Sequence, residues 1–286
     1  MRRRAFTLIE LLVVISIIAV LAAVSMPAAQ RARSQARTVA CRSNLRQWAF
    51  ATTTYANDHN GKLPGSWWQG WNGYASLLES YVRDHKPLNL CPAATRHRED
   101  SPLANRGDKS HAWWADLDGA LTFYSPVKGS YTFNGWVEDW SEPRGLSGLN
   151  PISEDEVSLW RAHVAKCWRT LDVKGAYRVP LVADSASWTL TPCDTDSPPA
   201  VEGDVLLAAP EGFHEAWRDT IKNACIDRHN AGVNMAFLDA STRKVDLKEL
   251  WTFRWNRQYD TANVWTRSGG VQPEDWPAWM RKFKEY

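Results

Sequence analysis

Glu10 is the residue whose type and position are most informative about chemistry, because it is a carboxylate in an otherwise apolar segment. From Phe6 to Met26 the only other polar residues are Thr7, Ser16 and Ser25. A helix needs roughly 20 apolar residues to cross the hydrocarbon core of a bilayer, so this segment is long enough to span one. A charge in such a segment is costly and usually has a functional partner. The sequence therefore predicts an ion pair at a membrane.

Three interpretations of this segment compete. A cleaved secretory signal also combines a basic start with an apolar core, but that core is usually about 7–15 residues long and gives no reason for Glu10. A plain single-pass anchor would gain nothing from a buried carboxylate. The third interpretation explains both features: the run from Arg2 to Ile15 closely resembles the processing and assembly signal of type IV prepilins and of type II secretion pseudopilins.

This resemblance implies a processing step and a partner for Glu10. In that family a membrane peptidase cuts just before the Phe and methylates the new terminus, which places the cut between Ala5 and Phe6. Most members have Gly where this chain has Ala5, so a small residue is kept. The cut exposes an amine on Phe6, and a carboxylate and an ammonium stay charged in a low-dielectric core only if they pair. The resemblance implies that Glu10 meets the terminal amine of a neighbouring subunit in a helical filament.

The orientation in the membrane rests on the resemblance rather than on charge. Arg2, Arg3 and Arg4 favour a cytoplasmic N-terminus, but arginines at 31, 33 and 37 balance that bias. The family implies a single-pass inner-membrane protein whose C-terminal domain is periplasmic or at the cell surface. Its partners would be the prepilin peptidase, other pilin or pseudopilin subunits and the membrane.

Composition and motifs exclude several function classes. The formal net charge falls from +2 to −1 when the three arginines of the leader are removed. That balance argues against nucleic-acid binding, which needs a basic surface. The sequence contains no His-Glu-x-x-His, no Gly-x-Ser-x-Gly and no phosphate-loop pattern, so we expect neither enzymatic activity nor a cofactor.

The five cysteines allow disulfides without defining them. In an oxidising compartment they could form two disulfides and leave one thiol, but spacing does not give the connectivity. Cys193 and Cys225 bracket a stretch rich in Pro and Asp and would close it as a loop, so they are the candidate pair.

The 17 tryptophans favour an aromatic core with one surface group. An indole buries a large apolar area, so most are expected inside the domain. Trp67, Trp68 and Trp71 lie in a Gly-rich stretch and are the best candidates for exposed rings that stack on sugars. The alternative function is therefore a membrane-anchored glycan-binding module, with polysaccharide as the partner.

One long helix is expected to organise the chain. Five residues on one face (Cys41, Leu45, Trp48, Thr52, Tyr55) recur every three or four positions, and Asn57 to Gly61 is a stop signal that ends the helix near Asp58. Pro27 should bend it. The predicted parts are a cleaved leader (1–5), a transmembrane and assembly helix (6–30), a spine helix (31–60) and an extracytoplasmic domain (61–286).

The outer domain is expected to be α+β and pilin-like, with the spine helix packed on a small antiparallel sheet that carries large loop insertions. Strand patterns cover 130–136 and 179–183, and 233–247 is typical of a hairpin. Ser153 and Glu156 form a capping box for a helix whose apolar stripe runs to Leu171. Residues 189–210 are expected to be a surface excursion. The tail from Trp251 should wrap the domain, with a short helix from Glu274.

A second, narrower resemblance covers scattered segments, including Cys41 to Gln47, Cys91-Pro92 and Leu181 to Ser185. They resemble, in order, a family of pseudopilin-like proteins abundant in planctomycete and verrucomicrobial bacteria. His229 followed by Asp239 matches that family's signature of His, nine residues and Asp-Gly, although Ala240 replaces the Gly. An Ala there either excludes the Gly-dependent turn or strains it.

The signature residues have two interpretations. In the first, a hydrogen bond from His229 fixes the start of the strand and Asp239 caps the turn, although each could also meet another segment such as Asp184 or Asp227. In the second, Asp227, Asp239 or Asp246 contributes to a calcium site, because hard cations prefer carboxylate oxygens.

Overall fold

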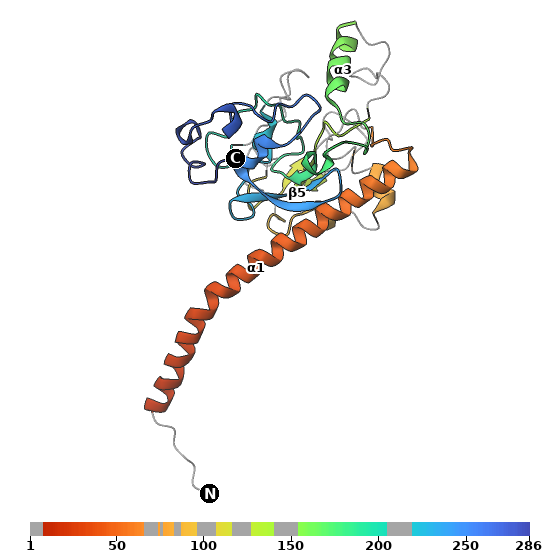
Figure 1. Ribbon diagram of the computed structural model, residues 1–286. Coiled ribbons are helices and arrows are strands. Elements are labelled where there is room, and N and C mark those ends of the chain that lie inside the picture. The colour runs from red at the N-terminus through yellow and green to blue at the C-terminus, as the bar shows by residue number, and fades with distance from the viewer. Residues whose placement is uncertain are drawn as a thin grey trace.

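The computed structural model describes residues 8–65, 74, 77–82, 87–95, 107–115, 127–139, 154–204 and 219–286. The fold is α+β: one helix of 51 residues, α1 (Leu8–Asp58), precedes a four-stranded antiparallel sheet. Figure 1 shows α1 as a long curved rod whose first half extends away from the domain and whose second half lies along it. This is the pilin-like arrangement that the sequence predicts.

Helix α1 ends where the stop signal predicts. Asn60 and Gly61 adopt left-handed backbone conformations, with φ of 57° and 79°, and the amide of Gly61 donates to the carbonyl of Ala56 at 2.7 Å. Such a left-handed residue closes a helix because it turns the chain and satisfies a terminal carbonyl. Pro27 lies inside the helix, where it removes one backbone hydrogen bond, and the rod continues through it with the curvature seen in Figure 1.

The sheet has the order β3-β4-β5-β6 and is antiparallel throughout. Its strands are β3 (Tyr131–Phe133), β4 (Pro180–Asp184), β5 (Gly232–Phe237) and β6 (Thr242–Asp246). β5 and β6 form the predicted hairpin, paired from Gly232 with Asp246 to Ala236 with Thr242. A separate pair of strands, β1 (Trp113–Ala115) and β2 (Val127–Gly129), forms a second small sheet.

Two cores cover the two faces of the larger sheet. The spine half of α1 packs on one face, where Trp48 meets Phe133 edge-on with ring centroids 5.6 Å apart. The tail after β6 packs on the other, where Trp251 and Trp276 lie 5.3 Å apart. Adjacent residues of β5 alternate between the two cores, with Ala236 in the first and Met235 in the second. The sheet is therefore buried on both sides, and the tail wraps the domain as predicted.

The remaining elements are short. α3 (Glu154–Lys166) is the second α-helix whose bounds are defined. The 3-10 turns are η1 (Glu79–Tyr81), η2 (Pro87–Asn89), η3 (Ala176–Arg178), η4 (Thr220–Asn223), η5 (Leu247–Thr252), η6 (Arg267–Gly269) and η7 (Pro273–Asp275).

Three local predictions need correction. α3 stops at Lys166 instead of reaching Leu171, because the amide of Trp168 donates to the carbonyl of Trp136 at 2.7 Å and ties the chain to another turn. Residues 189–204 are not a simple surface excursion, since Leu190 and Asp196 are buried. The predicted helix from Glu274 is only the 3-10 turn η7.

Asn134 is the side chain that joins three parts of the domain after β3. It is fully buried, and its amide nitrogen donates to the carbonyl of Pro180 at 2.9 Å and to that of Trp255 at 2.8 Å. Its side-chain oxygen accepts from the amide of Trp136 at 3.1 Å. The predicted Asn-Gly turn therefore has a second role, which is to bind the start of β4 and the tail.

We predict that Asn134→Ala lowers the free energy of unfolding by about 2–4 kcal/mol, because buried groups lose their partners. Denaturant unfolding of the full-length protein in detergent, followed by tryptophan fluorescence, measures the change. Asn57→Ala, at an exposed position on α1, is the control and should change stability by less than about 0.5 kcal/mol. Equal effects of the two substitutions would contradict this role of Asn134.

Candidate functional site

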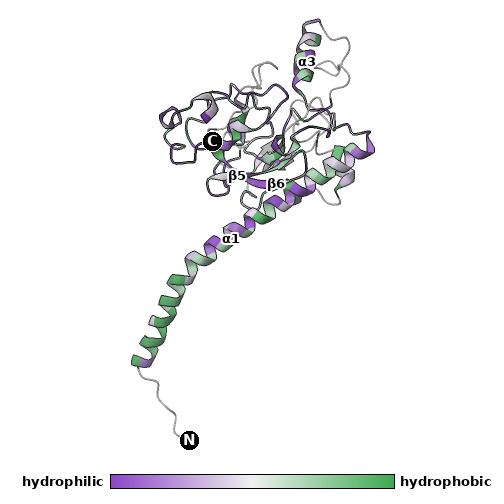
Figure 2. Ribbon diagram, in the orientation of Figure 1, coloured by the Kyte–Doolittle hydropathy of each residue, from purple (hydrophilic) through white to green (hydrophobic). Residues whose placement is uncertain are grey.

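The first half of α1 presents a continuous apolar surface. In the described part of the chain, α1 is the helix that is long and apolar enough to cross a membrane. None of its most apolar stretch of 18 residues is buried. Figure 2 shows this half in green and the polar residues further along the rod in purple. The exposed large side chains run from Leu8 to Met26. Monomeric soluble proteins rarely expose so large an apolar surface, which marks a site of contact with lipid or protein.

Glu10 differs chemically from the other polar residues of this half. It lies in the first turn of the described helix, and its side chain is exposed. The hydroxyls of Ser16 and Ser25 donate to helix carbonyls, those of Val13 and Leu21, both at 2.8 Å. An ionised carboxylate has no hydrogen to donate, so it cannot form such a hydrogen bond to a helix carbonyl. A carboxylate at this position therefore takes hydrogen-bond donors or cations as its partners.

A second site lies where α1 meets the sheet. His229 Nε2 is 3.1 Å from Asp184 Oδ2 at the end of β4, and both side chains are buried. The other ring nitrogen, Nδ1, is 3.2 Å from the hydroxyl of Thr38 on α1. The prediction that His229 could meet Asp184 is thus confirmed. His229 links the sheet to the helix through its side chain, and its backbone amide bonds Gly232 at the start of β5.

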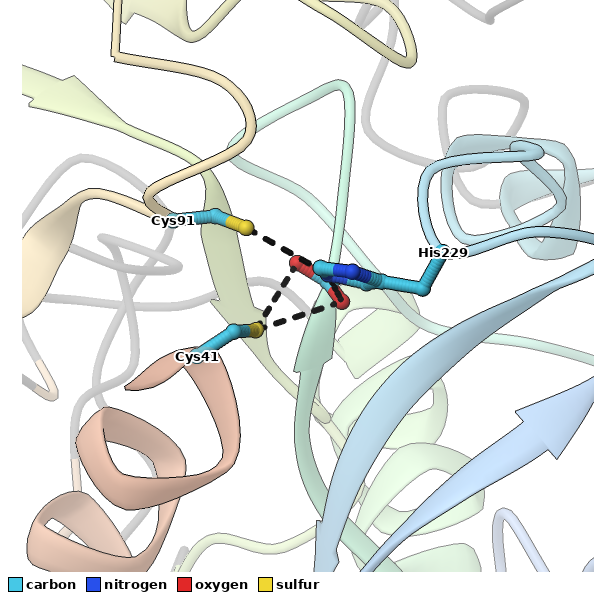
Figure 3. Close-up of side chains that lie close together, drawn as sticks. Cys41, Cys91 and His229 are labelled. Atoms are coloured by element: carbon cyan, nitrogen blue, oxygen red, sulfur yellow. Dashed lines mark hydrogen bonds and ion pairs between the residues drawn. The ribbon is translucent and has the colours of Figure 1, made fainter. Parts of the chain in front are cut away.

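Two cysteines complete this group. Cys41 Sγ lies 3.6 Å from each carboxylate oxygen of Asp184, and Cys91 Sγ lies 3.4 Å from His229 Nε2. Figure 3 shows the side chains of Cys41, Cys91 and His229 converging from a helix, a loop and the segment before a strand. One ligand atom from each of Cys41, Cys91, Asp184 and His229 lies within 4.8 Å of the others, and all four residues are buried. We call these four residues the Asp184 cluster.

Burial and charge act in opposite directions on the cluster. Burial raises the pKa of Asp184, but the hydrogen bond and charge of His229 and the charge of Arg228 outweigh it, so this pKa is lowered. Burial lowers the pKa of His229, but Asp184 and Cys91 raise it to about 9. Burial raises the pKa of Cys91, whereas Cys41, His229 and Arg228 bring it down to about 6. The environment therefore favours ionised forms of Asp184 and Cys91.

Arg228 forms an ion pair with the Asp184 carboxylate. Its Nη1 lies 3.2 Å from Asp184 Oδ1, and both side chains have no exposed surface. The same guanidinium donates to the carbonyls of Ser130 at 2.6 Å and Asp108 at 2.7 Å. A buried charge is tolerated when it is paired and hydrogen-bonded, and Arg228 meets both conditions.

The comparisons with known proteins address the N-terminal segment. The family model of the prokaryotic N-terminal methylation motif matches residues 1–26. The chain carries a prepilin-type methylation motif. This motif supports a pilin- or pseudopilin-type subunit, and chains that carry it are processed by a prepilin peptidase. No curated protein and no solved structure matches the chain, so the narrower resemblance stays a prediction.

Several predicted site residues lie outside the described residues. Ala5 and Phe6, on the two sides of the predicted cut, are among them, as are the predicted glycan contacts Trp67, Trp68 and Trp71. The buried tryptophans of the two cores are Trp48, Trp113, Trp136, Trp168, Trp251, Trp255 and Trp276. These positions support the interpretation that most indoles build the core.

The predicted disulfide between Cys193 and Cys225 is wrong, because all five cysteines are free thiols. Hydrogen bonds close this loop instead. The carboxylate of Asp196 accepts from the amide of Asp219 at 2.8 Å and from that of Ile221 at 3.1 Å. Cys225 is buried in the second core, where burial raises the pKa of its thiol. The spacing correctly suggested that this loop is closed, but hydrogen bonds close it rather than a disulfide.

The three calcium candidates have separate local roles. Asp227 accepts from the amide of Ala231 at 2.6 Å, and Asp246 forms a capping box with Glu249 at the start of η5. Asp239 accepts from the amide of Ser241 at 3.0 Å, so it caps the turn as predicted. Asp239 and Asp246 lie at opposite ends of the hairpin, more than about 13 Å apart at ~3.3 Å per residue, so one ion would not be bound by both. Calcium binding at any one of the three residues stays a prediction.

Ala240, which replaces the signature Gly, adopts a left-handed backbone conformation with φ of 62°. The turn therefore keeps the geometry that Gly would adopt, and the Ala240 backbone is strained. This is one of the two outcomes that the sequence predicts.

Sequence reasoning missed the Asp184 cluster as a unit. Cys41, Cys91 and Asp184 all fall in segments of the narrower resemblance, but nothing in their spacing indicates that they meet. The one usable signal is that Cys41 lies on the buried face of the spine helix, where a thiol must have a partner from the sheet or a loop.

We predict that Arg228→Met lowers the free energy of unfolding by about 3–5 kcal/mol, because it leaves the Asp184 carboxylate buried with one charge partner removed. Lys109→Met is the control, since it breaks the exposed pair of Lys109 with Glu202 and should change stability by about 0–1 kcal/mol. Denaturant unfolding measures both variants. A loss for Arg228→Met as small as that of the control would show that the buried pair does not hold the domain.

Proposed function

We propose that this chain is a structural subunit of a pilus or of a type II secretion-like pseudopilus, and that it assembles through the first half of α1. The observation that carries the proposal is the methylation motif on a helix that exposes its apolar half and buries its other half in a folded domain. In this proposal α1 carries the folded domain into the assembly, and the role of the chain is structural rather than enzymatic.

The apolar half of α1 needs a cover both before and after assembly. Lipid covers it while the subunit is a single-pass membrane protein, with the N-terminus in the cytoplasm and the domain outside. In a filament the same surface packs against the apolar halves of neighbouring subunits. Lipid tails and apolar side chains are similar environments, so moving between them costs little. The apolar surface alone therefore does not define how two subunits are aligned.

Glu10 supplies the missing alignment. After the cut the new amine belongs to Phe6, four residues before Glu10, and four residues of helix correspond to about 6 Å along the axis. Two charges in an apolar bundle are stabilised when each meets an opposite charge. If Glu10 pairs with the amine of the next subunit, neighbouring helices can stack only at one axial offset. Electrostatics then defines the stagger of a bundle that apolar packing leaves free to slide.

The spine half of α1 transmits this alignment to the domain. Its buried residues, from Cys41 to Ala56, lie in the core beneath the sheet. Because the helix is continuous, a fixed stagger of the apolar halves places the domains at a fixed repeat on the outside of the filament. The domain then becomes the surface that the assembly presents.

We predict that Glu10→Leu inserts into the membrane but does not assemble. The substitution keeps the apolar length and removes the carboxylate that pairs with the neighbouring amine. Membrane fractionation of the native cells measures insertion, and crosslinking between subunits or recovery of sheared filaments measures assembly. We expect insertion at the wild-type level and loss of the oligomers.

Ser16→Leu is the matched control, because it also replaces a polar residue of the same apolar half with Leu. The Ser16 hydroxyl bonds its own helix, so this variant should assemble normally. Normal assembly of Glu10→Leu would contradict the proposed role of the carboxylate, as would an equal loss of assembly in both variants.

A further inference from the structure

The Asp184 cluster has the composition of a metal site. We infer that Cys41, Cys91, Asp184 and His229 bind one divalent cation of the zinc type, which fastens the spine helix to the sheet. Two sulfurs, one imidazole nitrogen and one carboxylate oxygen form a four-ligand set that suits zinc. Calcium and magnesium prefer all-oxygen sites, so this set selects against them. The inference is independent of the proposed filament, since it concerns only the domain.

The distances between the ligand atoms fit tetrahedral coordination. Zinc bonds of about 2.3 Å to sulfur and about 2.0–2.1 Å to nitrogen or oxygen place neighbouring ligand atoms roughly 3.3–3.8 Å apart. Here Cys41 Sγ is 3.6 Å from Asp184, Cys91 Sγ is 3.4 Å from His229 Nε2, and His229 Nε2 is 3.1 Å from Asp184. All four atoms fall within 4.8 Å of one another. The pairs closest to that 4.8 Å limit would have to approach by up to about 1 Å to complete the tetrahedron.

The outer contacts orient His229 as a ligand. The hydroxyl of Thr38 donates its hydrogen to the carbonyl of Ser34 at 3.1 Å, so it can only accept from His229 Nδ1, which lies 3.2 Å away. Nδ1 therefore carries a hydrogen, and Nε2 faces the cluster. A cation takes the place of the Nε2 proton, since metal binding releases protons from its ligands. Such a bond to the other ring nitrogen is the usual support of a histidine ligand.

The carboxylate and one sulfur are held in the same way. Asp184 Oδ2 accepts from the amide of Asn234 at 2.8 Å, and its Oδ1 accepts from Arg228 at 3.2 Å. The amide of Ala93 donates to Cys91 Sγ at 3.4 Å, and this favours a thiolate at that position. Three of the four ligands thus have hydrogen-bond partners outside the cluster that hold their side chains in place.

The charges of the occupied site cancel. Two thiolates and the Asp184 carboxylate contribute −3, Arg228 contributes +1 and the cation contributes +2. A buried group of charges is stable only when it is close to neutral and well paired. Arg228 is therefore compatible with a divalent cation here rather than opposed to it.

The four ligands come from four separate segments. They are α1, the loop after η2, the end of β4 and the segment before β5. A cation at this point would join the helix to both central strands and to a loop. Because the unfolded chain does not bring these segments together, the binding energy would stabilise the folded domain.

The competing occupant is a disulfide between Cys41 and Cys91. Both are free thiols, and each sulfur contacts a different member of the Asp184–His229 pair. A disulfide would remove both sulfurs as anionic ligands and would leave that pair with Arg228 alone. The test below distinguishes the two.

The experiment uses full-length protein extracted from membranes in detergent. Elemental analysis by mass spectrometry should find one equivalent of zinc per chain after dialysis. Replacement by cobalt(II) should give thiolate-to-metal charge-transfer bands in the near ultraviolet and intense tetrahedral bands in the visible. The cobalt spectrum of the wild-type protein tests the site without any variant. Zinc absent even after incubation with zinc salt, or a cobalt spectrum without thiolate bands, overturns the inference.

Two matched pairs of variants locate the site. Cys41→Ala should abolish zinc binding, whereas Cys225→Ala, an equally buried cysteine outside the cluster, should retain it.

Thr38→Val should weaken zinc affinity about 10–100-fold by removing the partner of His229. Thr54→Val, which removes a similar helix-bonded hydroxyl, should not. Affinities are measured by competition with a chelator. A peptide mass that joins Cys41 to Cys91 in unreduced protein, or zinc retained by Cys41→Ala, contradicts the proposal.

Discussion

The structure depends on one constraint, which is that a single helix passes through two environments. From Leu8 to Met26 the helix exposes large apolar side chains, whereas from Cys41 onward one face of the same helix is buried in the domain. No break in the helix separates the two parts. Whatever covers the apolar half therefore also positions the domain. The methylation motif at residues 1–26 explains the first part, and the core beneath the sheet explains the second.

Asp184 holds the junction between helix and sheet. Its fully buried carboxylate contacts Arg228, His229, the amide of Asn234 and the thiol of Cys41. Apolar packing could stabilise such a junction without the cost of removing charges from water. The buried charges there therefore indicate a role beyond packing, such as metal binding. The same residues fix the rotation of α1 on the sheet, because Cys41 and Thr38 reach the cluster only from one face of the helix. A metal cation at this point would make that junction rigid.

Features with local causes could be predicted from the sequence. The end of α1, the β5–β6 hairpin and the cap at Asp239 all follow from turn residues and periodicity within a few positions. The end of α3 could not be predicted, since it depends on a bond from Trp168 to a distant carbonyl. The Asp184 cluster joins residues 41 to 229 and exists only once the sheet and helix have packed. The Cys193–Cys225 prediction failed because spacing does not reveal that hydrogen bonds of Asp196 already close the loop.

The proposed role of Glu10 requires that the N-terminal segment is processed to expose an amine for assembly. The intact mass and the N-terminal peptide of the protein isolated from native membranes test it most directly. We predict a chain that begins at Phe6 and is one methyl group heavier than the unmodified sequence. A chain that still begins at Met1 would contradict it, because no amine would then be available at Phe6 to meet Glu10, and α1 would serve only as an anchor.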